Sequence, residues 1–400
     1  MTDRFEVPGR LKMTGLLLTG VGLLAILLGA IFILPSEHGA ARFWVALLHN
    51  GVFFLLMTVA SIFIMAAVSM AQGAWIIAYR RVTEAIGANV WVFAIILFII
   101  LTCIVFGVGG ENHIYHWIHP EGDQILESKS SFLNKGMFFG FTIVTLIGFS
   151  LFGRKFRSMS LAQENAPKNS TRIYWRTIMI SAGFMVFYGL TTMSTAPWFW
   201  LMSIDAHWFS TMYSWYVFAS SFVSGMSLVL LWTVYLKNQG NLFIVTKEHM
   251  HDLGKFMFAF SIFWTYTWFC QYMLIWYGNI PEETVYYQTR QQGPYGLVFY
   301  ASFILNFIFP ILILMSAPSK RNYFTVVFMA IIIIFGHWLD FYLMAAPGPL
   351  GEHWHINWYE IGVLLGFVGV LILAVSKTLS KSNLIPHNNP MLKETLVHLS

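Results

Sequence analysis

Apolar stretches of about 20 residues recur from one end of the chain to the other, separated by short polar or turn-forming segments. As a helix, each stretch is long enough to cross the roughly 30 Å hydrocarbon core of a membrane. We therefore predict an all-α integral membrane protein with ten transmembrane helices. The predicted spans are residues 13–34, 43–70, 90–108, 132–152, 173–194, 209–236, 253–277, 295–315, 324–344 and 358–379.

The segments between the spans are short and contain turn signals, such as Pro35, the pair Gly109 and Gly110, and Pro281. No loop exceeds about 23 residues, which leaves no room for a soluble catalytic domain. Residues 72–89 mix apolar and charged side chains, and we expect a helix lying at the cytoplasmic membrane interface. The first apolar stretch, at about 22 residues, is longer than a signal-peptide core, so we treat it as a true span.

Composition supports this fold class, because 57% of the 400 residues are hydrophobic and only 10% are charged. A soluble chain of this size is normally about a quarter charged. Two cysteines, Cys103 and Cys270, both lie in apolar stretches. This excludes a disulfide framework, a cysteine-held iron–sulfur cluster and a covalently attached haem in this chain.

The distribution of basic residues predicts the orientation. All but four of the 23 Lys and Arg residues fall on one side of the ten predicted spans, together with both termini. Since Lys and Arg are retained on the cytoplasmic side of short loops, we expect both termini in the cytoplasm. The net charge of +5 follows from this topology and does not indicate a nucleic-acid partner.

A few ionisable residues within or beside the spans are the most informative, because such groups are costly in lipid and usually face a cavity or a partner. All of them fall in the outer half of the predicted membrane or at its outer edge, which indicates one shared site. They are His49 in the second span, Asp205 and His207 before the sixth, His337 and Asp340 in the ninth, and Glu360 at the start of the tenth.

His337 and Asp340 are three residues apart and therefore share one helix face. Such a pair can relay a proton or bind a quinol hydroxyl, but it can equally be a structural hydrogen bond between helices. His49 and Glu360 have structural alternatives too, as a carbonyl-bonded histidine and as an interfacial carboxylate. In the aromatic seventh span, Gln271 adds one polar group on the outer half.

Histidines in the outer loops have spacings that could hold a metal, but no Cys or carboxylate completes a ligand set, so we expect no metal site. These histidines are His113, His116, His119, His353 and His355. A haem b needs facing histidines within spans, and only His49 and His337 lie well inside spans, which disfavours haem. Pro310, in the eighth span, lacks an N–H and frees the carbonyl of Asn306, which predicts a kink.

Two stretches, residues 207–231 and 251–284, resemble the ActF-type membrane subunit of bacterial alternative complex III, within the NrfD/PsrC-like superfamily. The second contains the motif FSIFWTYTWFCQYMLIWYGNIPEET. The resemblance implies two four-helix bundles with one peripheral helix at each end. Applied to this chain, it gives residues 1–42 with the first span, 43–194 and 195–344 as the two bundles, and 345–400 with the last span.

The resemblance also implies a quinol-oxidising complex of the bacterial inner membrane. Menaquinol or ubiquinol would be the substrate, and electrons would pass to cytochrome c or a terminal oxidase. The expected partners are an ActC-type membrane subunit, an iron–sulfur subunit, and multihaem and monohaem cytochrome c subunits, which carry the clusters and haems.

On this view Asp205, His207, His337 and Asp340 form a quinol or proton site, with His49, Gln271 and Glu360 at its periphery. A purely structural anchor subunit and an independent secondary transporter remain alternatives.

Overall fold

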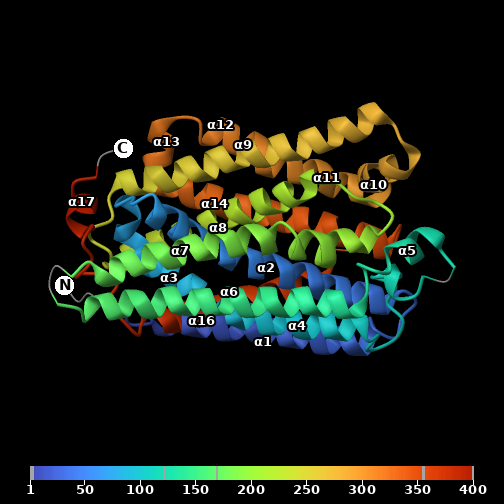
Figure 1. The fold of residues 1–400 in the computed structure, drawn as a ribbon, viewed down its shortest axis with the longest axis horizontal. Helices are drawn as coiled ribbons and strands as arrows, with labels where there is room; N and C mark the ends of the chain where they lie inside the picture. Colours follow the sequence, from blue (N-terminus) through green and yellow to red (C-terminus); the bar gives the residue numbers. More distant parts are fainter. Residues whose placement is uncertain (1–3, 121, 168–169, 354–355, 399–400) are drawn as a thin grey trace.

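The computed structural model describes residues 4–120, 122–167, 170–353 and 356–398, among which helices predominate and no β-strand forms. The long helices run side by side along one axis, and both termini lie at the same end of the molecule (Figure 1). The long helices are α1 (Gly9–Phe32), α2 (Gly39–Met70), α4 (Val90–Val105), α6 (Lys135–Glu164), α7 (Arg172–Thr192), α8 (Met212–Asn238), α9 (Lys247–Gly278), α14 (Tyr323–Ala345) and α16 (Trp358–Leu379). The shorter helices are α3 (Arg80–Gly87), α5 (Gln124–Lys129), α10 (Pro281–Gln291), α11 (Gly296–Phe303), α12 (Phe309–Ile313), α13 (Ala317–Arg321), α15 (Pro347–Leu350) and α17 (Leu392–Leu396).

Nine helical stretches in the described part of the chain are long and apolar enough to cross a membrane, so the protein is a multi-pass α-helical membrane protein. They correspond to nine of the ten predicted spans. The remaining predicted span lies in α9, a helix of 32 residues that is rich in Trp, Tyr and Thr and is not among these nine stretches. The prediction of helices is thus confirmed for each apolar stretch.

Two predicted boundaries differ from the structure more than the others. Helix α6 continues to Glu164 instead of ending at residue 152. The reason is that its last turns pack against the C-terminal segment, which runs from Thr378 at the end of α16 through Asn388. After α7, the chain continues in a π-helical segment, Thr195–Leu201, and a 3-10 turn, Met202–Asp205, where a loop was expected. The helix is interrupted just before Pro310, where a π-helical segment, Ile304–Ile308, separates α11 from α12.

At the centre of the structure lie α2 and α8, which are almost wholly buried. Helix α2 contacts α4, α7, α8 and α14, and α8 also contacts α9. The first and last long helices form a separate pair, α1 against α16, in which Gly15, Gly22 and Gly29 are buried. The backbones approach so closely that a Cβ added to Gly22 would lie 2.2 Å from the Cα of Gly366, as expected for helices that pack through small residues in a membrane.

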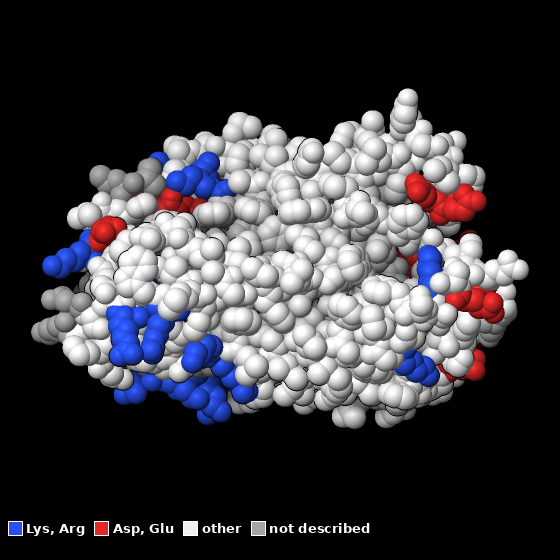
Figure 2. All heavy atoms as spheres, viewed as in Figure 1, with Lys and Arg blue, Asp and Glu red and all other residues white. Residues whose placement is uncertain are grey.

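The two ends of the molecule differ in charge. Lys and Arg side chains gather at the end where both termini lie, over α6 and α7 among others, which we call the basic end (Figure 2). Acidic side chains are prominent at the other end, where α5 and α10 lie and which we call the α10 end (Figures 1 and 2). Between them the visible surface is almost free of charge, as a membrane-spanning surface requires.

Candidate functional site

The carboxylate of Asp340 is the centre of a buried polar cluster formed by three helices. Asp340, on α14, is 1% exposed. Its Oδ1 accepts a hydrogen bond from the hydroxyl of Tyr216, on α8. Its Oδ2 accepts from the Ser220 hydroxyl at 3.0 Å and from the Trp264 indole N–H, on α9, at 2.9 Å. All three donors are uncharged, so the carboxylate is hydrogen-bonded without being paired to Lys or Arg among the described residues.

His337 belongs to the same cluster, one helical turn before Asp340. Its Nδ1 lies 2.9 Å from the Ser220 hydroxyl and 3.7 Å from Asp340 Oδ2. Because a hydroxyl has one proton, Ser220 can donate to Asp340 only while it accepts from an Nδ1–H of His337. That arrangement leaves Nε2 of a neutral His337 as an acceptor, and this buried atom has no hydrogen-bond partner among the described residues.

A cavity borders Asp340 on the side of α9, α10 and α11. Its volume of about 20 Å³ holds about one water molecule. The wall includes Tyr216, Trp264 and Gln271, and Gln271 donates to the Tyr287 hydroxyl at 2.9 Å. The carbonyl oxygen of Gln271 is buried without a partner among the described residues. The cavity is thus small, and among its lining residues Gln271 has an unpartnered polar atom.

An aromatic wall separates this cavity from the outer surface between α9 and α11. Trp268, which is partly buried, stacks on Tyr272 with ring centroids 5.8 Å apart. The Trp268 ring also contacts Phe299 and Phe303, at centroid distances of 5.4 and 5.3 Å. Trp268, Phe299 and Phe303 all line the cavity, so these aromatic rings form its wall between α9 and α11.

Arg290, on α10, connects Asp205 to the cavity. It is 3% exposed and lines the cavity. Its guanidinium donates to Asp205 Oδ2 at 2.8 Å and to the Leu343 carbonyl at 2.9 Å, and it lies 3.4 Å from the ring centre of Tyr286. Burial raises the pKa of Tyr286 to about 12, so its phenol is neutral at physiological pH.

The structure thus brings together Asp340, His337, Gln271 and, through Arg290, Asp205. His207 lies elsewhere, on the surface of the α10 end, where its Nε2 is 2.8 Å from Asp123 Oδ2. Asp123 also caps α5 by accepting from the backbone N–H groups of Ile125 and Leu126. Desolvation raises the pKa of Asp123, but these hydrogen bonds and the contact with His207 outweigh it and hold the pKa below its usual range.

His49 and Glu360 lie outside the cavity wall. His49, on α2, is buried beside Trp338, with its Nε2 3.4 Å from the Asn50 amide nitrogen. Glu360 caps α16 and forms a bidentate ion pair with Arg42 on α2, with N to O distances of 2.8 and 3.0 Å. The contacts of Glu360 are therefore those of a group that joins two helices.

The loop histidines do not converge in the described part of the chain, where no group of three His, Cys, Asp or Glu side chains could hold a metal ion. His113 is exposed beside Glu111, and His353 stacks on His38 with ring centroids 4.7 Å apart. His355 lies outside the described residues.

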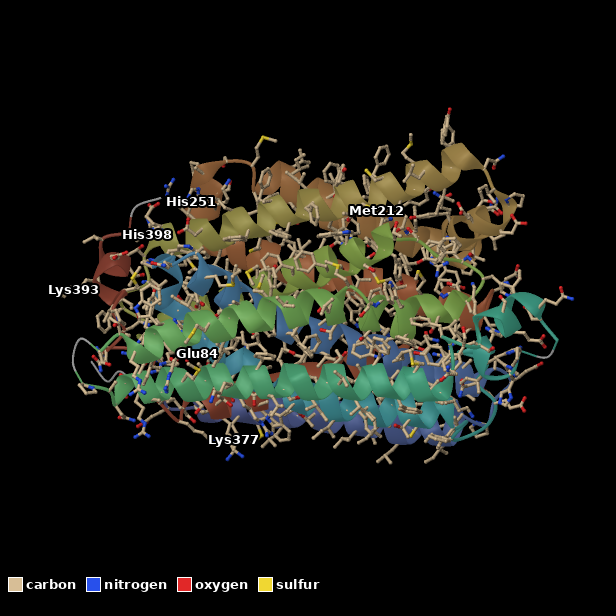
Figure 3. The ribbon with its side chains drawn as sticks, viewed as in Figure 1. Glu84, Met212, His251, Lys377, Lys393 and His398 are labelled. Carbon is tan, nitrogen blue, oxygen red and sulfur yellow. The ribbon has the colours of Figure 1, made fainter. Side chains whose placement is uncertain are left out.

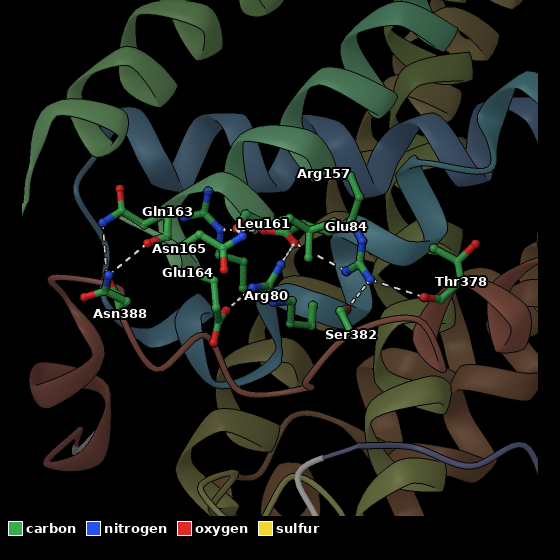
Figure 4. Close-up of polar contacts among 11 residues, drawn as sticks. Arg80, Glu84, Arg157, Leu161, Gln163, Glu164, Asn165, Thr378, Ser382 and Asn388 are labelled. Atoms are coloured by element: carbon green, nitrogen blue, oxygen red, sulfur yellow. Dashed lines mark hydrogen bonds and ion pairs between the residues drawn. The ribbon is translucent and has the colours of Figure 1, made fainter. Parts of the chain in front are cut away.

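A second buried polar cluster occupies the basic end (Figure 4). Glu84, on α3, accepts from Arg80 at 2.8 Å and from Arg81 at 3.2 Å, and lies 3.5 Å from Arg157 of α6. Arg81 also pairs with Glu164. Figure 3 shows Glu84 toward the basic end and Met212, at the start of α8, on the opposite side of the molecule's centre.

The position of this cluster corrects the expectation for residues 72–89. The segment is helical, but Arg80, Arg81 and Glu84 are at most 4% exposed instead of lying at an open interface. The reason is that α6 and the C-terminal segment cover it, with Arg157 donating to the Thr378 carbonyl and to the Ser382 hydroxyl.

Comparison with known proteins adds no assignment, since no model of a protein family matches this chain and no curated protein matches it.

Proposed function

We propose that this protein is the membrane subunit of a quinol-oxidising respiratory complex, and that the Asp340 cluster receives protons from quinol at the outer side of the bacterial inner membrane. The observation that carries the proposal is the environment of Asp340, a buried carboxylate held by three uncharged donors at the wall of a cavity. A carboxylate without a paired cation can take up a proton without leaving a buried charge uncompensated.

The topology in this proposal has ten spans, with α9 as the span additional to the nine apolar stretches. Helices α2, α4, α6 and α7 form one four-helix bundle, and α8, α9, the α11–α12 segment and α14 form the other, with α1 and α16 outside them. The concentration of Lys and Arg at the basic end supports a cytoplasmic location for that end and for both termini. The α10 end then faces outward.

The proposed chemistry uses two proton acceptors of the cluster, the Asp340 carboxylate and Nε2 of His337. When a quinol becomes a quinone, both O–H bonds break and two protons and two electrons leave the ring. Asp340 accepts one proton, and the unpartnered Nε2 of His337 accepts the other. An iron–sulfur cluster on a partner subunit would accept the two electrons one at a time and would pass them to c-type haems, cytochrome c or an oxidase.

Access for the quinol requires a local opening, because a cavity of about 20 Å³ holds a water and not a ring. In the proposal, rotation of Trp268 away from Phe299 and Phe303 admits the ring from the lipid between α9 and α11. Gln271 then offers its free carbonyl oxygen to a ring hydroxyl.

The test is Asp340→Asn in the complex purified from its native membrane through a tag on this chain. We expect the partner subunits to remain bound and quinol-dependent reduction of cytochrome c to fall by about 100-fold or more. The matched control is Glu127→Gln, the same change from acid to amide at an exposed position of the same end, which leaves turnover unchanged.

Full turnover and full proton release by Asp340→Asn in an intact complex would eliminate the chemical role and leave a structural anchor. Isolation of the unmodified chain without iron–sulfur or haem partners, under conditions that retain other membrane complexes, would favour the transporter.

A further inference from the structure

A groove on the lipid-facing side of α6 and α7 combines free positive charge with an apolar floor. It lies near the basic end and has a volume of about 500 Å³. Its polar lining consists of Lys155, Ser158 and Arg176, and its apolar lining includes Ile173, Met179 and Ile180. No carboxylate lines it, although Glu164 is on the same helix.

The two cations of the groove differ from their buried neighbours in being unpaired. Arg80, Arg81 and Arg157 all meet Glu84 or Glu164. Lys155 and Arg176, by contrast, are exposed and have no ion pair with any described residue. Two positive charges therefore face the same opening, and the nearby carboxylates are already occupied.

The groove lies near the ends of two membrane-spanning helices, where phospholipid headgroups are expected. Arg176 is four residues from the start of α7, and Lys155 is nine residues from the end of α6, which correspond to about 6 and 14 Å along the helix axes. A lysine at that depth extends its amine toward the interface. Trp175, which is 52% exposed, marks the interfacial level on α7.

We propose that this groove binds an anionic phospholipid, with the phosphate between Lys155 and Arg176, a polar headgroup or glycerol oxygen at Ser158, and one acyl chain along Met179 and Ile180. A zwitterionic lipid has no net charge to complement the two cations, and a soluble anion makes no use of the apolar floor. The proposal requires only that these helices lie in a membrane, so it does not depend on the quinol proposal.

The test uses native mass spectrometry of the full-length protein purified in detergent, stripped of lipid and titrated with phosphatidylglycerol or phosphatidylcholine. We expect the unmodified protein to prefer phosphatidylglycerol. The double variant Lys155→Gln and Arg176→Gln binds phosphatidylglycerol about 30-fold more weakly and loses the preference. The reason is that each of the two surface cations contributes about 1 kcal/mol toward binding an anionic lipid. Thermal melts establish that the variant is folded.

The control is Lys377→Gln with Lys393→Gln, the same loss of charge at exposed positions of α16 and α17 (Figure 3). This pair retains the preference. An equal loss in the control would mean that the whole basic end attracts anionic lipid and that no groove site exists. Equal binding of both lipids by the unmodified protein, or displacement of phosphatidylglycerol by inorganic phosphate alone, would also overturn the proposal.

Discussion

Two buried carboxylates, Glu84 near the basic end and Asp340 in the half toward the α10 end, are both almost inaccessible, yet their partners are opposite in kind. Glu84 contacts three guanidinium groups, whereas Asp340 receives its hydrogen bonds from a phenol, a hydroxyl and an indole. A buried charge among cations is compensated and costly to neutralise. A carboxylate among uncharged donors has no such compensating charge, so neutralising it leaves no cation unpaired.

The amino-acid sequence alone does not distinguish Glu84 from Asp340, but their surroundings do. The Glu84 cluster joins α3, α6 and the C-terminal segment, and its charges are mutually dependent. The Asp340 cluster joins α8, α9 and α14, but it also borders a cavity and contains His337 with one free ring nitrogen. Asp340 lines its cavity directly, whereas the small cavity beside the Glu84 cluster is lined by Arg80 and Glu164 and not by Glu84.

The largest effect on stability is expected from Glu84→Gln. It leaves Arg80 and Arg157 without their carboxylate and lowers the free energy of unfolding by about 3 to 5 kcal/mol. Asp340→Asn, the same type of change, costs about 1 to 2 kcal/mol because its neighbours are uncharged. Chemical denaturation in detergent measures both, with exposed Glu394→Gln as the control. Equal losses for Glu84→Gln and Asp340→Asn would remove the distinction between the clusters.

A smaller effect than that of Glu84→Gln is expected from Tyr216→Phe, which deletes the only hydrogen-bond donor to Asp340 Oδ1 among the described residues. We predict a loss of about 1 to 3 kcal/mol in the free energy of unfolding, since a buried acceptor remains unsatisfied. Quinol turnover also falls, while Tyr300→Phe, at an exposed position, changes neither. Normal turnover in Tyr216→Phe would indicate that this donor does not tune the carboxylate.

His249, at the basic end, stabilises the fold in its neutral state, and we therefore predict that stability depends on pH. His249 lies in the first turn of α9, outside its apolar part, and its Nε2 is 3.1 Å from the Thr395 hydroxyl of α17. Burial lowers its pKa to about 4. Because an undocked histidine has its ordinary pKa near 6.5, docking of α17 is strongest above pH 6.5 and weakens as the pH falls toward 4. The charged and titratable groups that also act on this ring are His398, Asp252, Lys237 and Glu248.

Hydrogen exchange in α17 at pH 7 and pH 5, corrected for the intrinsic rates, measures this change. We expect faster exchange at pH 5 in the unmodified protein and no pH dependence in His249→Gln. His398→Gln removes the contact with Asp252 but retains the pH dependence. Retention of the effect in His249→Gln would assign it to another group.

The smallest effect is expected from His207→Gln, since the contact with Asp123 is half exposed at the surface. Exposed pairs contribute little, so the free energy of unfolding changes by within about 0.5 kcal/mol and quinol turnover is unchanged. A large loss of turnover, measured in the same assay as for Asp340→Asn, would return His207 to the candidate site.

The sequence alone predicts the elements well because apolar length is a local property. It also predicts the pairing of His337 with Asp340, which depends only on helix periodicity, and the interruption at Pro310, which depends on one missing N–H. Gln271 was identified as the single amide of an aromatic helix. Each of these signals is contained within one span.

The partners of Asp340 could not be predicted in this way, because Tyr216 and Trp264 reach it from two other helices. The ion pair of Arg290 with Asp205 joins residues far apart in the chain, and the only local signal was an arginine on the side with few basic residues. The burial of Arg80 and Arg81 also depends on distant segments, α6 and the C-terminal region, that cover them. In each case the missing information is how helices pack.

The pairing of α1 with α16 has a consequence for biosynthesis. Gly22 and Gly366 are separated by about 340 residues, which a ribosome needs tens of seconds to translate at roughly 5 to 20 residues per second. Helix α1 is therefore made well before its glycine-matched partner α16. Until then, its row of Gly15, Gly22 and Gly29 faces lipid or an insertion factor, and this pair closes only after the helices between them have been synthesised.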